Sequence, residues 1–248
     1  MHSLHSDGSL SPQALLELAC ERGVDQMAIT DHDTISAYAE LTGSPEIANK
    51  SVKLITGCEF SCLWSGRNIH VVGLNLDLQE PGLLNAMEIQ AKARIERAQT
   101  IADILSRQGF ENTLEGAQAN AAGGTIGRPH FAQYLIDAGY VKNMKQAFKQ
   151  YLGAGKPGDV KANWPDLQRA CQWIRGAGGI PVLAHPMKYG LTLTKLRKLC
   201  DEFKAVGGQG LEVISGAQDP VKTNTLASLA EDLGFFASTG SDFHQPGQ

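Results

Sequence analysis

Two patterns of hydrophobic and polar positions alternate along this 248-residue chain. Short apolar runs bounded by Gly, Pro and polar residues predict strands, and apolar positions that recur every three or four residues predict helices. The expected strands cover residues 26–30, 52–56, 69–76, 180–184, 210–214 and 235–238. The expected helices between them cover residues 11–22, 164–177, 194–206 and 220–233. Strands that alternate with helices indicate βαβ units, so we expect an α/β fold with a mostly parallel sheet or barrel.

The stretch from residue 81 to residue 158 departs from this alternation. It predicts helices at 83–108, 128–138 and 142–152 but no convincing strand. We therefore interpret residues 81–158 as a helical insertion, and residues 1–80 and 159–248 as the barrel that carries it.

Composition narrows the class of protein without identifying it. Hydrophobic residues make up 42% and charged residues 19% of the chain, which is typical of a globular enzyme. The net charge of -4 gives no overall basic field that would indicate nucleic-acid binding. No apolar run approaches the ~18 residues that a membrane span needs, and the first residues lack a signal-peptide pattern, so we expect a cytoplasmic protein. The five cysteines contain no CxxC pair, which argues against a disulfide framework and against a cysteine-based zinc site.

Most side chains that can bind metals follow an expected strand. These residues are Asp31, His32 and Asp33 after the first strand, Glu59 after the second, His185 after the fourth, and Asp242 and His244 after the last. The N-terminus adds His2 and Asp7, and His70 is an exception near the start of its strand. Loops at the carboxyl ends of parallel strands converge on one site, so we expect these side chains to meet.

A mixture of imidazole and carboxylate groups suits zinc, manganese or iron. Each motif alone has an ordinary alternative: a lone histidine is commonly a hydrogen-bonded core residue, DHD can cap a helix, and GSDFH can form a turn. Asp242 and His244 are two residues apart, a spacing that projects both side chains to one face of an extended segment. The combination of these placements at the ends of several strands favours a metal site.

Six motifs then carry a resemblance to a known family. In order, they are HSLHSDGSLSP, AITDHDT, GCEFS, IHVVGL, VLAHP and STGSDFH, and over nearly the whole chain they resemble the PHP domain (polymerase and histidinol phosphatase). This resemblance implies a distorted (β/α)7 TIM-like barrel with a trinuclear metal centre at its C-terminal mouth. The segments GRPHFAQYLIDAG and YLGAGKPGDV look like the branch that dephosphorylates 3',5'-nucleoside bisphosphates such as pAp. Members of that branch are also described as 5'-to-3' exonucleases on short RNA.

The resemblance implies a set of site residues and a cofactor. The implied metal ligands are His2, Asp7, His32, Glu59, His70, His185, Asp242 and His244. They would hold two to three divalent ions, with manganese expected first and iron or zinc as alternatives. We expect catalytic roles for Glu59, which would bridge two metals, for His185 and His244, and for Asp33. Asp33 would orient a ligand or, equally, cap the following helix.

The insertion is expected to bind the substrate. A Gly-rich turn leads into Arg128 and His130, and free amides at that helix start could hold a phosphate. Lys156 and Lys188 add further positive charge. The expected partner is a small nucleotide with two phosphates, or short RNA, and no obligate protein partner is expected.

The sequence departs from the family pattern at its start. Relatives begin with a strand that ends in HxHSxxSDG, whereas here Met1 takes the place of x and the first histidine is missing. We therefore expect the natural chain to extend upstream of Met1, and also past GSDFHQPG.

Three other functions remain as alternatives. The first is a histidinol-phosphate phosphatase, which shares the chemistry. The second is a non-catalytic PHP module of the kind attached to DNA polymerases. The third is a mononuclear iron oxygenase, which needs only two histidines and one carboxylate and is disfavoured by the excess of ligands.

Overall fold

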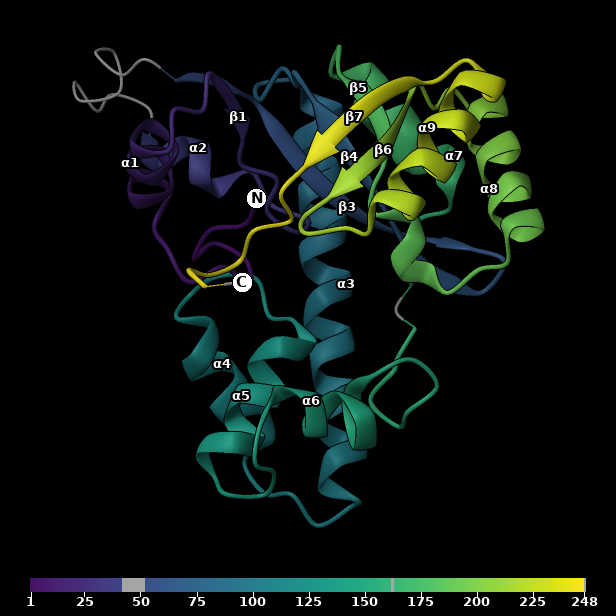
Figure 1. Cartoon of the computed structure of the whole chain (residues 1–248). Helices are drawn as coiled ribbons and strands as arrows, with labels where there is room; N and C mark the ends of the chain where they lie inside the picture. Colours follow the sequence, from purple (N-terminus) through teal and green to yellow (C-terminus); the bar gives the residue numbers. More distant parts are fainter. Residues whose placement is uncertain (42–51, 162, 248) are drawn as a thin grey trace.

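The computed structural model describes residues 1–41, 52–161 and 163–247, in which helices surround two sheets (Figure 1). The smaller sheet pairs β1 (Gln26–Ala28) in parallel with β2 (Lys53–Ile55). The larger sheet has the order β3 (Gly57–Trp64), β4 (Arg67–Leu74), β5 (Ile180–Leu183), β6 (Gly210–Ser215) and β7 (Phe236–Gly240). The expected α/β class is confirmed.

Strand β3 corrects the sequence prediction, which placed Glu59 in a loop. Glu59 is the third residue of β3, and nearly every position of this strand is buried. A strand buried on both faces lacks the polar–apolar alternation that marks a half-exposed strand, so the pattern did not reveal it. Strand β4 is antiparallel to both β3 and β5. Its N-terminal end, with His70, therefore lies at the same edge as the C-terminal end of β5.

Backbone hydrogen bonds link the two sheets and the N-terminus. His32 and Glu59 form a parallel bridge between the segment after β1 and strand β3. On the other side, Thr30 N donates to Met1 O over 2.8 Å, and His2 N donates to Phe243 O over 2.9 Å. The first residues therefore lie between the end of β1 and the segment after β7. Within the described residues no strand pairing joins β7 to β1, so the two sheets do not form a closed barrel there.

Helices cover the outside of the sheets. These are α1 (Pro12–Glu21), α2 (Ser36–Leu41), α7 (Leu167–Gly176), α8 (Leu193–Ala205) and α9 (Pro220–Leu233), and all except α2 were predicted within a few residues. The side chain of Ser11 accepts a hydrogen bond from Ala14 N and caps α1. Leu15, Leu16 and Ala19 of this helix are buried, as the apolar spacing indicates.

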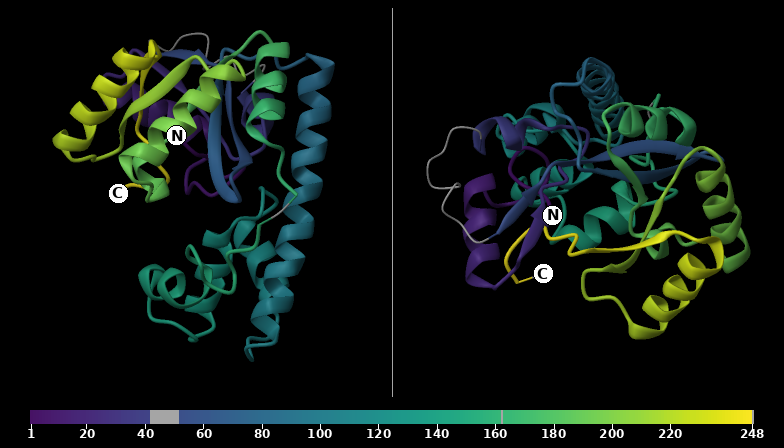
Figure 2. Two further views of the ribbon diagram at one scale, coloured as in Figure 1. Left: turned by 90° about the vertical axis from the view of Figure 1, so that its right-hand side faces the viewer. Right: turned by 90° about the horizontal axis from the view of Figure 1, so that it is seen from above.

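A second group of helices extends below the sheets, and its longest member begins beside them (Figures 1 and 2). It contains α3 (Pro81–Ser106), α4 (Thr113–Ala121), α5 (Arg128–Asp137), α6 (Met144–Ala147) and the π-helical turn Phe148–Leu152. The N-terminal part of α3 packs on the main core through Leu83 and Ala86. Its C-terminal part, with Ile101 and Leu105, belongs to a separate apolar cluster formed with the other helices of this group. Helix α3 therefore joins the two groups.

All five cysteines are free thiols, and four of them are buried. In the part of the chain that the structure describes, no helix is both long enough and apolar enough to cross a membrane.

Candidate metal centre

The eight side chains expected as ligands lie together at the carboxyl edge of the sheets, with Glu59 at the centre. Its Oε1 atom is 2.6 Å from His70 Nδ1, 3.0 Å from His185 Nε2 and 3.9 Å from His32 Nδ1. Its Oε2 atom is 3.3 Å from His2 Nε2. One carboxylate thus faces four imidazoles from four separate segments of the chain.

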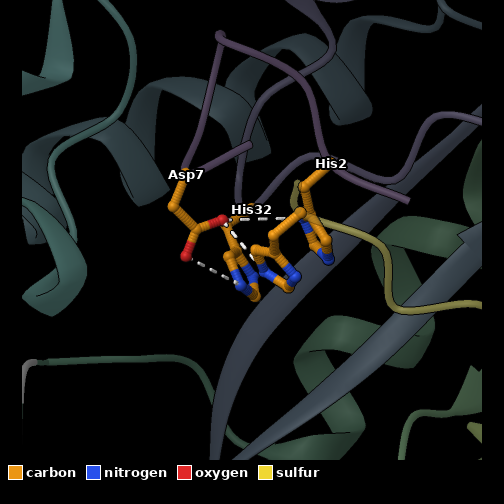
Figure 3. Close-up of side chains that lie close together, drawn as sticks. His2, Asp7 and His32 are labelled. Atoms are coloured by element: carbon orange, nitrogen blue, oxygen red, sulfur yellow. Dashed lines mark ion pairs between the residues drawn. The ribbon is translucent and has the colours of Figure 1, made fainter. Parts of the chain in front are cut away.

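Asp7 provides a second carboxylate from the N-terminal loop (Figure 3). Its Oδ2 atom is 3.8 Å from His32 Nε2, and its Oδ1 atom is 3.4 Å from His244 Nε2 and 3.8 Å from His2 Nδ1. Asp242 provides the third carboxylate, with Oδ1 3.5 Å from His2 Nε2. Asp7 and Asp242 come from opposite ends of the sequence, and both lie beside imidazoles of the cluster.

The donor atoms form three overlapping groups, each with its ligand atoms within 4.8 Å of one another. The groups are His2, Asp7, His32 and His244; His32, Glu59 and His70; and His2, Glu59 and Asp242. Shared ligands between adjacent groups are what a multinuclear centre requires.

Among the residues that the structure describes, several buried polar atoms of this cluster have no hydrogen-bond partner: His2 Nδ1, Asp7 Oδ1, His32 Nδ1 and His185 Nδ1. Buried polar atoms in proteins are normally hydrogen-bonded, so a concentration of exceptions at one site needs an explanation. Nitrogen and oxygen donors of this kind bind divalent metal ions. The residues present therefore fit two or three such ions.

The electrostatics of the cluster also favour cations. Burial alone would raise the pKa of Glu59, but the nearby His32 and His70 hold that pKa well below its usual range. Burial would likewise lower the pKa of His2, but the Asp242 and Glu59 carboxylates raise it to about 9. Burial holds the pKa of His32 well below its usual range. The direction of the Glu59 shift favours its charged form, which attracts cations.

The loop that carries His2 and Asp7 is held by Asp31. The Asp31 carboxylate accepts hydrogen bonds from Ser3 N at 2.6 Å, Ser3 Oγ at 2.5 Å and Ser6 Oγ at 2.6 Å. The sequence analysis counted Asp31 among the side chains that can bind metals. In the structure, its carboxylate instead accepts hydrogen bonds from the loop that carries His2 and Asp7.

Asp33 has a different position from the one expected. Its buried carboxylate accepts hydrogen bonds from Ser61 N at 2.6 Å, Gln90 Nε2 at 2.7 Å and Arg94 Nε at 2.7 Å. It does not cap α2, because Ser36 N at the start of that helix donates to Thr34 Oγ1. None of these three hydrogen bonds involves one of the eight clustered residues. The Asp33 side chain instead joins the loop after β1 to α3.

The four residues expected to bind substrate do not all lie near the cluster. Arg128 and Lys188 line a cavity of about 600 Å³ together with His70 and His185. Lys156 is exposed and is not among the residues that line this cavity.

His130 has a structural contact near the arginine pocket. Its buried Nδ1 atom accepts a hydrogen bond from Gly127 N at 2.9 Å, which stabilises the start of α5. The expected contact of its ring with a phosphate stays a prediction. The remaining histidine, His5, pairs with Glu40 at 2.9 Å and lies outside the cluster, as expected.

Two arginines of α3, Arg94 and Arg97, were missed by the sequence analysis. They line one pocket with His32, with His70 and with Arg128 at the start of α5, which was expected to bind substrate. The spacing of Arg94 and Arg97 on a predicted helix places them on one face, but only tertiary structure shows that this face is buried beside the metal ligands.

Three arginines and one carboxylate, Asp7, line the arginine pocket, so positive charge outnumbers negative charge among its lining side chains. Arg94 pairs with Asp33, and Arg128 pairs with Asp159 at 3.2 Å. Arg97 donates from Nε to Val160 O at 3.0 Å, and no ion pair of Arg97 with a carboxylate occurs in the described residues. Burial, with the charges of Arg128 and Arg94, lowers the pKa of Arg97 to about 9. An anion in this pocket would offset the excess charge.

Buried imidazoles and carboxylates at one edge of a mixed α/β fold define a protein with a candidate multinuclear metal centre. A model of the PHP domain family matches residues 1–160, and the chain belongs to this family. The resemblance based on six sequence motifs is thereby confirmed.

Relatives match over nearly their whole length. A 5'-3' exoribonuclease of Haemophilus influenzae is 44% identical over 247 residues, covering 99% of this chain and 88% of the relative. A 3',5'-nucleoside bisphosphate phosphatase of Chromobacterium violaceum is 38% identical over 248 residues, covering 100% of this chain and 86% of the relative. Both names agree with the branch that the sequence resembles.

Solved structures show the same fold. A structure described as an amidohydrolase from Chromobacterium violaceum, with bound sulfate and no metal, has a TM-score of 0.91 and 38% identity over 99% of this chain and 86% of its own. A predicted metal-dependent phosphoesterase from Bifidobacterium adolescentis has a TM-score of 0.87 and 28% identity over 100% of this chain and 87% of its own.

Proposed function

We propose that this protein is a metal-dependent phosphoesterase that releases phosphate from 3',5'-nucleoside bisphosphates, with short RNA as a related substrate. The observation that carries the proposal is the position of the arginine pocket (Arg94, Arg97 and Arg128) beside the metal-type cluster, with His32 and His70 common to both. A substrate with two phosphates has one group to place at each site. The names of the relatives from Haemophilus influenzae and Chromobacterium violaceum support the same substrates.

The three donor groups around Glu59, Asp7 and Asp242 would hold the cations, for which manganese is our first choice. Bound cations supply charge that neutralises the phosphoryl oxygens, and they lower the pKa of water so that hydroxide forms near neutral pH. The protein's own part is to fix the phosphate in line and to provide a proton for the leaving oxygen. The Glu59 carboxylate outweighs the effect of burial and raises the pKa of His185, so this ring can hold that proton.

The second phosphate would bind in the arginine pocket. Guanidinium groups bind phosphate with paired, charge-assisted hydrogen bonds. Arg97 is the best placed of the three, because Arg94 and Arg128 already pair with carboxylates. The Trp164 ring lies against both helix arginines, 5.6 Å from Arg94 Cζ and 5.9 Å from Arg97 Cζ, and would keep them aligned. Residues 81–158 would thus determine specificity, while residues 1–80 and 159–248 would carry the metals.

We also propose that the strands form the distorted barrel typical of the family. The bridge between His32 and Glu59 and the hydrogen bond from His2 N to Phe243 O support this arrangement, because they connect neighbouring segments around the metal-type cluster.

Phosphate-release kinetics test the proposal. The protein, stripped with a chelator and then supplied with Mn²⁺, should hydrolyse adenosine 3',5'-bisphosphate, and it should be inactive before the metal is restored. Adenosine 5'-monophosphate and histidinol phosphate are the comparison substrates, because neither can occupy both sites with phosphate. Preference for histidinol phosphate would support the alternative phosphatase, and no release from any substrate would support the non-catalytic module.

A further inference from the structure

Glu212 is a buried carboxylic acid that the proposed hydrolysis does not use. It lies on β6 with 8% of its surface exposed, and it lines the same internal cavity as His2, Glu59, His185 and Asp242. None of the three groups of metal-type donors found among the described residues includes it. Its Oε2 atom instead accepts a hydrogen bond from the backbone N–H of His185.

The backbone at His185 needs such a partner. His185 has a φ of 29°, in the left-handed region that side chains other than glycine rarely adopt. The pairing of β5 with β6 ends at Leu183 and Leu211, so the His185 amide lies beyond the ladder. The Glu212 carboxylate takes the place of a ladder acceptor and satisfies this buried amide.

The neighbouring strand makes room for this carboxylate. A Cβ atom added at Gly240 of β7 would lie only 1.6 Å from Glu212 Oε1. The pairing of β6 with β7 also shifts register between Glu212 and Ile214. The glycine on β7 and the register shift in β6 therefore both occur next to the Glu212 side chain that accepts the hydrogen bond from His185.

We propose that Glu212 is a positioning residue that holds the His185 backbone in its left-handed conformation and so directs the His185 ring at the metal centre. In that conformation, His185 Nε2 lies 3.0 Å from Glu59 Oε1 and 3.2 Å from His70 Nδ1. Relaxation of the backbone would move the ring away from both atoms. The expected effect of Glu212 on catalysis rests on the proposed function. Its expected effect on the position of the His185 ring does not.

Three variants and two controls separate a positioning role from other roles. Glu212→Gln keeps an acceptor oxygen of the same reach, whereas Glu212→Ala removes it. Gly240→Ala displaces the carboxylate without altering it. Gly176→Ala is the matched glycine control, because a Cβ there meets no atom within 4 Å. Glu231→Ala, at an exposed position of α9, is the matched glutamate control.

The first measurement is Mn²⁺ affinity by calorimetry on the whole protein, with folding checked by circular dichroism. We expect Glu212→Gln and both controls to stay within about threefold of the unmodified protein. Glu212→Ala and Gly240→Ala should weaken binding about 10- to 100-fold, the range found when a partner of a metal ligand is removed. If Glu212→Gln binds as weakly as Glu212→Ala, the carboxylate charge matters and the positioning role is wrong. If Glu212→Ala binds like the unmodified protein, the role is also wrong.

The second measurement needs neither metal nor substrate. The Cε1–Hε1 signal of His185 in the NMR spectrum of the metal-free protein should move in Glu212→Ala and in Gly240→Ala but remain in place in Glu212→Gln. An unmoved signal in Glu212→Ala would overturn the inference even if the protein proves to be a bisphosphate phosphatase. A moved signal would support it even if the bisphosphate assay fails.

Discussion

The Asp33 carboxylate lies 2.7 Å from Arg94 Nε, and this buried ion pair connects the loop after β1 to helix α3. Arg94 also donates to Ile126 O at 3.1 Å and to Ser61 Oγ at 3.3 Å. The pair thus fixes the helix that carries the arginine pocket against the strand that carries Glu59.

Loss of Arg94 should destabilise the protein. Arg94→Ala leaves the Asp33 charge buried with only Gln90 and the Ser61 amide as partners, a situation that costs roughly 3 kcal/mol of unfolding free energy. Urea unfolding followed by circular dichroism measures this cost, and Arg107→Ala, at an exposed position after the same helix, serves as the control. Equal unfolding midpoints for the two variants would show that the ion pair contributes little.

Asp31 should affect metal binding although it belongs to none of the three groups of metal-type donors found among the described residues. Asp31→Ala frees the loop that carries His2 and Asp7, because the contacts to Ser3 and Ser6 are lost. We expect Mn²⁺ affinity to fall about 10- to 100-fold in calorimetry. Asp25→Ala removes an exposed carboxylate from the same region of the chain and should leave the affinity unchanged. A similar loss in both variants would point to a general effect of charge.

Metal removal should be visible in thermal stability. Mn²⁺ that binds only the folded protein stabilises it by about 2.7 kcal/mol at a concentration 100 times its Kd, so the melting temperature should rise on titration. Glu59→Gln should abolish most of this rise, since Glu59 faces four of the imidazoles. Glu17→Gln, on the exposed side of α1, should keep it. A full thermal shift in Glu59→Gln would remove Glu59 from the centre of the site.

Arg128 and Lys156 should differ in their effect on substrate affinity. Arg128→Ala removes a guanidinium from the arginine pocket and should raise KM for adenosine 3',5'-bisphosphate about tenfold, which corresponds to about 1.4 kcal/mol. KM for a monophosphate should change little. Lys156→Ala, outside the residues that line the neighbouring cavity, should leave both constants unchanged. Equal losses on both substrates in Arg128→Ala would contradict a role in binding the second phosphate.

The metal-type ligands could be predicted because strand ends converge whatever the details of the sheet. His32, His185 and Asp242 each follow a strand that the apolar pattern revealed. Glu59 was assigned correctly as a member of the cluster but to a loop, since β3 is buried along nearly its whole length and lacks alternation. His70 was left as an exception because antiparallel pairing of β4 depends on tertiary structure.

The arginine pocket shows where local pattern fails. Arg97 resembles any other charged residue of a long helix until the packing of Trp164 and Arg128 around it is known. Lys156, on a Gly-flanked loop, looked more suited to bind phosphate but is exposed. Burial of a charge is a property of the assembled fold, and a charge on a predicted helix gives no sign of it.

Helix α3 spans 26 residues, which at about 1.5 Å per residue makes a rod of roughly 39 Å. One end is anchored among the strands and the other among α4, α5 and α6, and both helix arginines project from the middle. Leu105 is buried in the apolar cluster that α3 forms with α4, α5 and α6, away from the arginine pocket. A substitution there would therefore tilt α3 and weaken substrate binding.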